Sequence, residues 1–141
     1  MTTPSLEFHH IGVACRSLDK EAHPLLGMGY RPEGEDFEDP MQGVRGRFLV
    51  GPGPRLELLE PLEGRDTLDP FLARGVKMYH HAFETPDLDA ATDWYISQRA
   101  RVVAPARPAV AFGGRRVVFL ALPTLFIIEL IETPRELDAN A

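Results

Sequence analysis

The chain has 141 residues, enough for one compact domain with its own core or for two very small half-domains. Its 44% hydrophobic and 26% charged residues are typical of a globular protein and exclude a largely disordered one. The net charge of −6 argues against a nucleic-acid partner, although two arginines could still hold one small anionic ligand.

The first half of the chain predicts one βαβββ module over residues 6–62. It begins with a β-rich segment, Leu6–Ala14, followed by the helix start Ser17-Leu-Asp, where a side-chain oxygen can cap free backbone N–H groups. Pro24 and Gly27 limit the predicted helix to about two turns. Three strands are expected next, with Gly51-Pro-Gly-Pro as the turn between the last two: Tyr30–Phe37, Val44–Val50 and Arg55–Leu59.

The second half predicts the same order of elements. Residues 63–76 are a linker with a short helix, Leu68–Arg74, and a second module follows over residues 77–133. That module is expected to contain a strand, a helix and three further strands: Met78–Thr85, Asp87–Arg99, Arg101–Ala106, Arg115–Ala121 and Leu125–Glu132. A C-terminal tail over residues 134–141 follows it.

The two halves also match in sequence, as an internal repeat would. His80 lies 70 residues after His10, the pair Phe119-Leu120 lies 71 residues after Phe48-Leu49, and Ile128-Glu129 lies 72 residues after Leu56-Glu57. Small changes in loop length produce this slow drift. We therefore expect an α+β fold of two tandem βαβββ modules within a single domain.

The repeat places candidate metal ligands at equivalent positions of the two halves. His10 and His80 lie on the first strand of each module, and Glu57 and Glu129 lie on the last. Pseudo-twofold symmetry would bring the four together around a common axis. Two imidazoles and two carboxylates suit a borderline or hard divalent ion and leave coordination positions open for substrate.

Each of these residues also has an ordinary structural explanation. A single histidine on a half-buried strand is commonly a hydrogen-bonded core residue, and the outer face of a sheet explains a single glutamate between aliphatic neighbours. A matched pair of each type favours the metal, because an isolated carboxylate on the inner face would be costly.

The sequence also indicates where the protein works. The single cysteine, Cys15, cannot form an intrachain disulfide, and Met1-Thr-Thr-Pro does not begin a secretory signal. The longest apolar run, residues 120–128, is interrupted by Pro123 and Thr124 and is too short to span a bilayer. We expect a cytoplasmic protein without membrane contact.

Six sequence motifs occur in order along the chain: His10-Ile-Gly-Val, Gln42-Gly-Val, Leu56-Glu-Leu-Leu-Glu-Pro-Leu, His80-His-Ala-Phe-Glu, Gly114-Arg-Arg-Val-Val-Phe-Leu and Ile128-Glu-Leu-Ile-Glu. Together they resemble the vicinal oxygen chelate superfamily, which includes glyoxalases, bleomycin-resistance proteins and dioxygenases. Within it the chain is similar to methylmalonyl-CoA epimerases over about residues 8–132. The resemblance implies an open, cup-shaped mixed sheet around one metal ion, a homodimer, and the ligands His10, Glu57, His80 and Glu129.

The chain departs from the epimerase pattern at three places. Gly46 stands where these epimerases carry a catalytic carboxylate on the strand after Gln-Gly-Val, the first helix is shorter by about a turn, and the basic loop before the last strand is reduced to Leu122-Pro-Thr. The loss of the carboxylate at Gly46 predicts either a one-base isomerisation or a different substrate.

The resemblance implies a metal-dependent isomerase or epimerase, or a related lyase, that stabilises the enolate of a small carbonyl or acyl-thioester substrate. Cobalt, nickel, manganese, zinc or iron could serve as the ion. Glu129 is the first candidate for the catalytic base and Glu57 the second, while the substrate-binding candidates are Arg115, Arg45, Arg47 and Gln42. The substrate would be an acyl-CoA or another anionic carbonyl compound.

Two other functions stay open. The same cup could carry an Fe(II)-dependent dioxygenase, which commonly uses two histidines and one carboxylate. It could also be a metal-free protein that binds a small drug-like molecule, a function that needs no ligand quartet.

Overall fold

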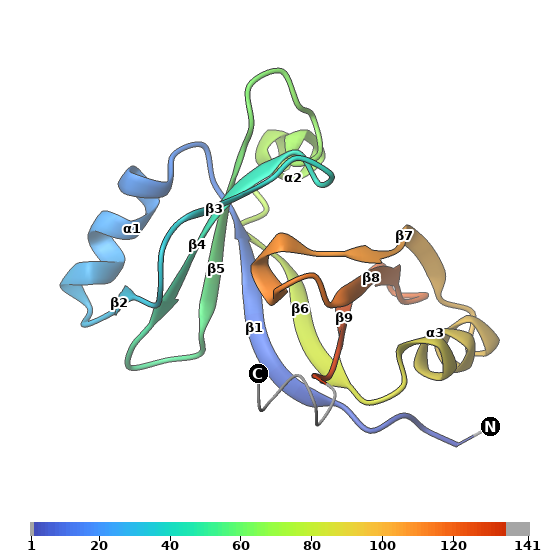
Figure 1. The fold of residues 1–141 in the computed structure, drawn as a ribbon. Helices are drawn as coiled ribbons and strands as arrows, with labels where there is room; N and C mark the ends of the chain where they lie inside the picture. The colour runs from blue at the N-terminus through green and yellow to red at the C-terminus, as the bar shows by residue number, and fades with distance from the viewer. Residues whose placement is uncertain (1, 135–141) are drawn as a thin grey trace. The chain divides into compact units, whose positions relative to one another are not determined.

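The computed structural model describes residues 2–134, and within them the chain forms nine β-strands and three α-helices (Figure 1). They fall into two units: residues 10–79, the first unit, and residues 2–9 with 80–134, the second unit. The linker and its short helix α2 (Asp69–Arg74) therefore belong to the first unit.

The first unit is a mixed sheet with a helix on one face. Its sheet has the order β2-β4-β5-β1, with β3 paired to β4; β1 and β5 are parallel and the other pairs antiparallel. Leu56 and Leu58 of β5 pack with α1 in one apolar cluster. Glu57, which lies between them, points to the opposite face of the sheet. On that face Leu59 packs with Leu68, next to α2. The elements are β1 (Glu7–Ala14), α1 (Leu18–Gly27), β2 (Arg31–Pro32), β3 (Phe37–Asp39), β4 (Val44–Val50) and β5 (Leu56–Pro61).

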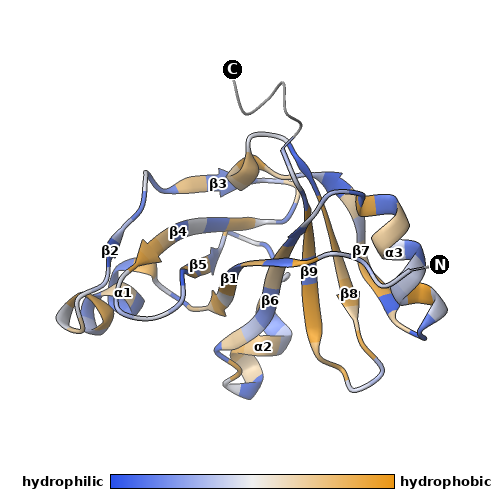
Figure 2. Cartoon of the chain, turned by 90° about the horizontal axis from the view of Figure 1, so that it is seen from below, coloured by the Kyte–Doolittle hydropathy of each residue, from blue (hydrophilic) through white to orange (hydrophobic). Residues whose placement is uncertain are grey.

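The second unit repeats this plan with the order β6-β9-β8-β7. Strands β6 and β9 are parallel, and the remaining pairs are antiparallel. Leu88 and Ala91 of α3 pack on Leu120 and Leu130, and Figure 2 shows how apolar β8 and β9 are. The elements are β6 (Met78–Thr85), α3 (Leu88–Ser97), β7 (Arg101–Pro108), a 3₁₀ turn (Val110–Phe112), β8 (Arg116–Ala121) and β9 (Ile127–Glu132).

The expected α+β class and the open, mixed sheet are confirmed, and most strand ends agree within one or two residues. The predicted single strand Tyr30–Phe37 is wrong, because the chain forms two short strands, β2 and β3, that both pair with β4. Pro32 has no N–H for a ladder, and Gly34 has a φ of +74°, which an extended strand cannot accommodate.

Helix α1 also differs from the prediction of two turns. It has 10 residues and continues through Pro24. The Ser17 side chain caps it by accepting a hydrogen bond from the Lys20 N–H at 3.2 Å, and Leu18 and Ala22 are buried against the sheet. Packing of this face outweighs the one backbone hydrogen bond that proline removes.

No helix in residues 2–134 has the length and apolar character needed to cross a bilayer. Residues 135–141 of the expected tail lie outside the part of the chain that the structure describes.

Candidate metal centre

In the first unit, His10 of β1 and Glu57 of β5 form a buried pair. The parallel register sets Gly12 beside Glu57, so that His10, two residues earlier, projects from the same face of the sheet. His10 Nε2 lies 3.1 Å from Glu57 Oε1, and the two side chains are 0% and 6% exposed. The pairing supplies the polar partner that a carboxylate in this apolar setting requires.

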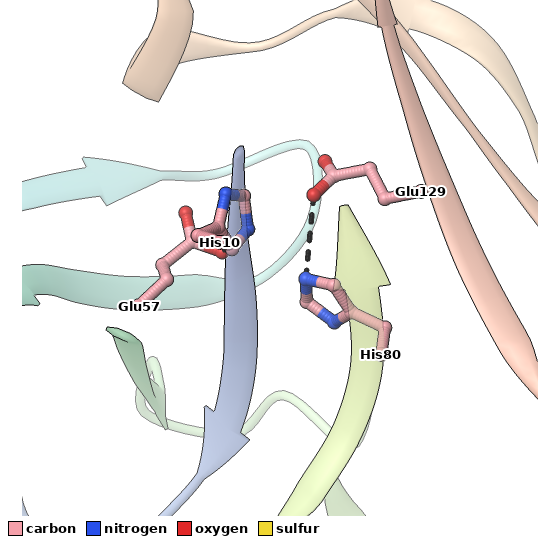
Figure 3. A group of neighbouring side chains, drawn as sticks. All are labelled: His10, Glu57, His80 and Glu129. Carbon is pink, nitrogen blue, oxygen red and sulfur yellow. Dashed lines mark ion pairs between the residues drawn. The ribbon is translucent and has the colours of Figure 1, made fainter. Parts of the chain in front are cut away.

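In the second unit, His80 of β6 and Glu129 of β9 form the equivalent pair. Ala82 lies beside Glu129 in the parallel register, and His80 Nε2 is 3.3 Å from Glu129 Oε1 (Figure 3, dashed line). These side chains are 0% and 2% exposed. Each unit therefore places one imidazole nitrogen and one carboxylate oxygen next to each other on side chains that are at most 6% exposed.

A phenylalanine accompanies each pair. The rings of His10 and Phe48 are 5.4 Å apart and those of His80 and Phe119 are 5.1 Å apart, both edge-to-face. Phe48 is the cross-strand partner of Glu57, and Phe119 is that of Glu129. The repeated element is thus a His–Phe–Glu triad. The matching Phe-Leu pairs are visible in the sequence repeat, but the contact of each ring with a histidine is not.

The donor atoms fit a divalent metal ion. Two neighbouring ligands, each about 2.1 Å from one ion and at right angles, would be about 3 Å apart. The separations of 3.1 and 3.3 Å within the two pairs agree with that value. Each unit supplies one imidazole and one carboxylate without a thiolate, and these are the donors that a borderline or hard ion prefers.

The neighbouring histidines contact other parts of the second unit. The ring of His9 lies 5.3 Å from that of Phe112, and the ring of His81 lies 4.8 Å from that of Phe126. Burial lowers the pKa of His81, which favours its neutral form.

Arg45 and Arg47 lie on the face of β4 opposite to the His10–Glu57 pair. Arg47 is the cross-strand partner of Leu58, which packs with α1, whereas Phe48 is that of Glu57. The Arg47 guanidinium donates two hydrogen bonds of 2.8 Å to Asp36 and one of 2.9 Å to Asp19 of α1. These bonds lower the pKa of the Asp36 carboxyl and hold Arg47 away from Glu57.

Arg45 has weaker contacts on the same face as Arg47. Its guanidinium lies 3.7 Å from Asp36 and 3.6 Å from Glu60. Glu60 also accepts a hydrogen bond from the backbone N–H of Leu18, at the start of α1. Neither arginine of β4 is placed to hold a substrate group beside Glu57.

Arg115 and Gln42 are engaged within their own units. Arg115 Nη1 donates hydrogen bonds of 2.8 Å to Glu84 and to the carbonyl of Glu132, which ties the segment before β8 to β6 and β9. Gln42 donates from its backbone N–H and its side-chain amide to the buried carboxylate of Asp39, at 3.1 Å each. Both contacts stabilise the fold locally.

Gly46 has no carboxylate to offer, and the space above it is occupied. The ring of Phe37, its cross-strand partner on β3, covers this position.

The sequence and the fold both have known relatives. Residues 9–119 match the Glyoxalase/Bleomycin resistance protein/Dioxygenase superfamily. The ethylmalonyl-CoA/methylmalonyl-CoA epimerase of Cereibacter sphaeroides is 27% identical over 114 residues, which cover 79% of this chain and 85% of that protein.

Two solved structures are similar over almost the whole chain. The crystal structure of methylmalonyl-CoA epimerase from Mycobacterium tuberculosis has 28% identity and a TM-score of 0.74, covering 100% of this chain and 97% of that one. A variant of the Streptomyces coelicolor methylmalonyl-CoA epimerase in complex with 2-nitronate-propionyl-CoA has 27% identity and a TM-score of 0.73, covering 96% and 100%. The superfamily match spans most of the sequence, and this chain therefore belongs to the Glyoxalase/Bleomycin resistance protein/Dioxygenase superfamily.

Proposed function

We propose that the protein is a metal-dependent isomerase of the epimerase type that acts on a small carbonyl compound or an acyl thioester. The observation that carries this proposal is the buried His–Glu pair that each unit repeats. The superfamily, and the similarity to proteins named methylmalonyl-CoA epimerase, support the reaction class and make an acyl-CoA the first substrate to test.

In this proposal His10, Glu57, His80 and Glu129 hold one divalent ion, which is cobalt, nickel, manganese, zinc or iron. When bound, the ion would polarise a carbonyl or thioester oxygen of the substrate and lower the pKa of the adjacent C–H. The separation of nitrogen and oxygen within each pair supports the assignment, as does the burial of all four side chains.

Glu129 is the proposed base. Its carboxylate would accept the proton from the carbon next to the polarised carbonyl and return it later in the cycle. Glu57 is the second candidate, because it occupies the equivalent position in the other unit.

The absence of a carboxylate at Gly46 limits what Glu129 could do alone. One base can move a proton between neighbouring carbons or return it to the face from which it came. Inversion at a single carbon requires a proton donor on the opposite face. We therefore propose a one-base proton transfer, in which exchange of the substrate C–H with solvent is faster than inversion.

The test measures deuterium uptake from D₂O into methylmalonyl-CoA and ethylmalonyl-CoA by mass spectrometry, with cobalt-loaded protein. We expect uptake that falls at least about 100-fold in Glu129→Gln, which keeps an oxygen ligand but cannot act as a base. The matched control is Glu63→Gln, at an exposed glutamate of the linker, and it should keep the wild-type rate. Full activity of Glu129→Gln with metal bound would remove Glu129 as the base, and no uptake into either thioester by the wild type would contradict the proposed substrate class.

A further inference from the structure

Gly46 allows an aromatic ring to pack directly on the backbone of β4. A Cβ atom built on Gly46 would lie 2.7 Å from Cε1 and Cε2 of Phe37, and closer still to Cζ. Real Cβ atoms do not approach other atoms so closely, so any side chain here would displace the ring. Glycine within a strand often marks such a close approach, at a cost in strand stability.

The ring of Phe37 is connected to the His10–Glu57 pair through the ring of Phe48. Its centroid lies 5.8 Å from that of Phe48, with 31° between the ring planes, and the Phe48 ring contacts His10 edge-on. Residues Gly46, Phe48 and Glu57 share one face of the sheet, because Phe48 pairs with Glu57 and lies two residues from Gly46. Both phenylalanines are only partly buried. Phe37 and Phe48 thus form an aromatic wall beside the pair.

This wall has no counterpart at the equivalent position of the second unit. Val117, which lies 71 residues after Gly46, is 1% exposed and pairs with Ile131 and Arg107. The His–Phe–Glu triads are alike in the two units, whereas the ring over Gly46 occurs in the first unit. Phe37 thus differs between the two units, although it lies beside a His–Glu pair that both units share. Such a residue is a candidate determinant of substrate specificity.

The polar residue that shares a face of β3 with Phe37 is engaged in hydrogen bonds within its own turn. Asp39 lies two residues after Phe37 and is 1% exposed, but its two carboxylate oxygens accept hydrogen bonds from Gln42. The surface that Phe37 and Phe48 present is therefore apolar.

We infer that the aromatic wall of Phe37 and Phe48 binds an apolar group of the substrate next to the oxygens that the metal centre receives. This inference rests on the proposed function, because it needs His10 and Glu57 to be metal ligands. It predicts a substrate with an alkyl or aryl substituent beside its chelating oxygens. Phe37 and Phe48 select substrates by size and polarity.

The experiment compares two 2-keto acids that differ in one substituent, pyruvate and phenylpyruvate. Both present neighbouring carboxylate and ketone oxygens to a metal. Their dissociation constants are measured with cobalt-loaded protein by titration of the visible cobalt spectrum. We expect phenylpyruvate to bind the wild type at least about tenfold more tightly than pyruvate, because its ring leaves water.

Phe37→Ala should reduce this preference to less than about threefold, with the affinity for pyruvate unchanged within about threefold, because only the ring contact is lost. Phe37→Leu serves if the alanine variant does not fold, and its preference should be lower than that of the wild type. The matched control is Phe126→Ala, which removes a ring that contacts His81 and should keep the full preference.

Cobalt bound without a preference for phenylpyruvate, or a preference retained by Phe37→Ala, overturns the aromatic wall and leaves the proposed metal centre standing. A wild type without a cobalt spectrum overturns the metal centre itself, and the inference with it.

Discussion

Replacing Gly46 by alanine should destabilise the protein only while Phe37 is present. The new methyl group would lie within 2.7 Å of two ring carbons and force the ring aside. Overpacking of this kind costs about 1–3 kcal/mol, and the better strand propensity of alanine returns about 0.5–1 kcal/mol. The expected net loss in the free energy of unfolding is therefore about 1–2 kcal/mol.

In a Phe37→Ala background the clash is gone, so Gly46→Ala should be neutral or stabilising by up to about 1 kcal/mol. The coupling energy of the double-mutant cycle is then about 1–3 kcal/mol, well outside the additivity expected of independent sites. Urea unfolding of the four proteins, followed by far-UV circular dichroism, measures it.

Gly27→Ala is the matched control, since a Cβ there meets no atom within 4 Å, and it should not destabilise. Additivity within about 0.5 kcal/mol at Gly46 and Phe37 would refute the packing on which the aromatic wall rests.

Three further predictions concern single side chains. Burial raises the pKa of Cys15 from 9.0 to about 11, so this thiol ionises at lower pH in the unfolded chain than in the folded protein. The free energy of unfolding should therefore fall as the pH rises from 9 to 11, by about 2 kcal/mol at pH 10.5. Urea unfolding at pH 8 and 10.5 should show no such loss in Cys15→Ala, and an equal loss in that variant would contradict this cause. Arg47 lowers the pKa of Asp36 below 3.8, so the ion pair of Arg47 and Asp36 stabilises the fold above pH 4 and is lost as the pH falls through the lowered pKa. In urea unfolding from pH 6 to 2, Asp36→Asn should therefore lose less stability at low pH than the wild type. An equal loss in both proteins would argue against this ion pair. Arg115→Lys should lower the free energy of unfolding by about 1 kcal/mol, because it weakens the contacts to Glu84 and β9, and it should leave methylmalonyl-CoA binding unchanged. Urea unfolding measures the stability and calorimetry the binding. Weaker binding at unchanged stability would indicate that Arg115 binds the substrate.

Much of this architecture could be predicted from the sequence because both units repeat strong local patterns. The alternation Leu56-Glu-Leu on β5 and its counterpart on β9 indicated which residues share a face, and the repeat located His10 and His80. The pairing of histidine with glutamate within each unit follows from the parallel register of β1 with β5 and of β6 with β9, which are the first and last strands of each unit.

Other features depend on contacts that no local pattern encodes. The course of α1 through Pro24 depends on its packing against the sheet, and the interruption between β2 and β3 depends on the backbone conformation of Gly34. Phe48, and not Arg47, shares a face of the sheet with Glu57, because Phe48 pairs with Glu57 in the register of β4 and β5. A shift of this register by one residue would exchange the two, and the sequence does not fix it. Glycine at position 46 suggested a missing carboxylate, but only the structure shows the ring of Phe37 over it.

The proposed function depends most on the metal centre, and the metal content of the purified protein tests this centre directly. Elemental analysis should find about one divalent ion per chain in the wild type, and the ion should be lost in both His10→Ala and His80→Ala, because each unit supplies one histidine. A wild type that stays empty after incubation with cobalt, nickel, manganese, zinc and ferrous iron would contradict the proposed metal centre, as would full metal occupancy in both variants.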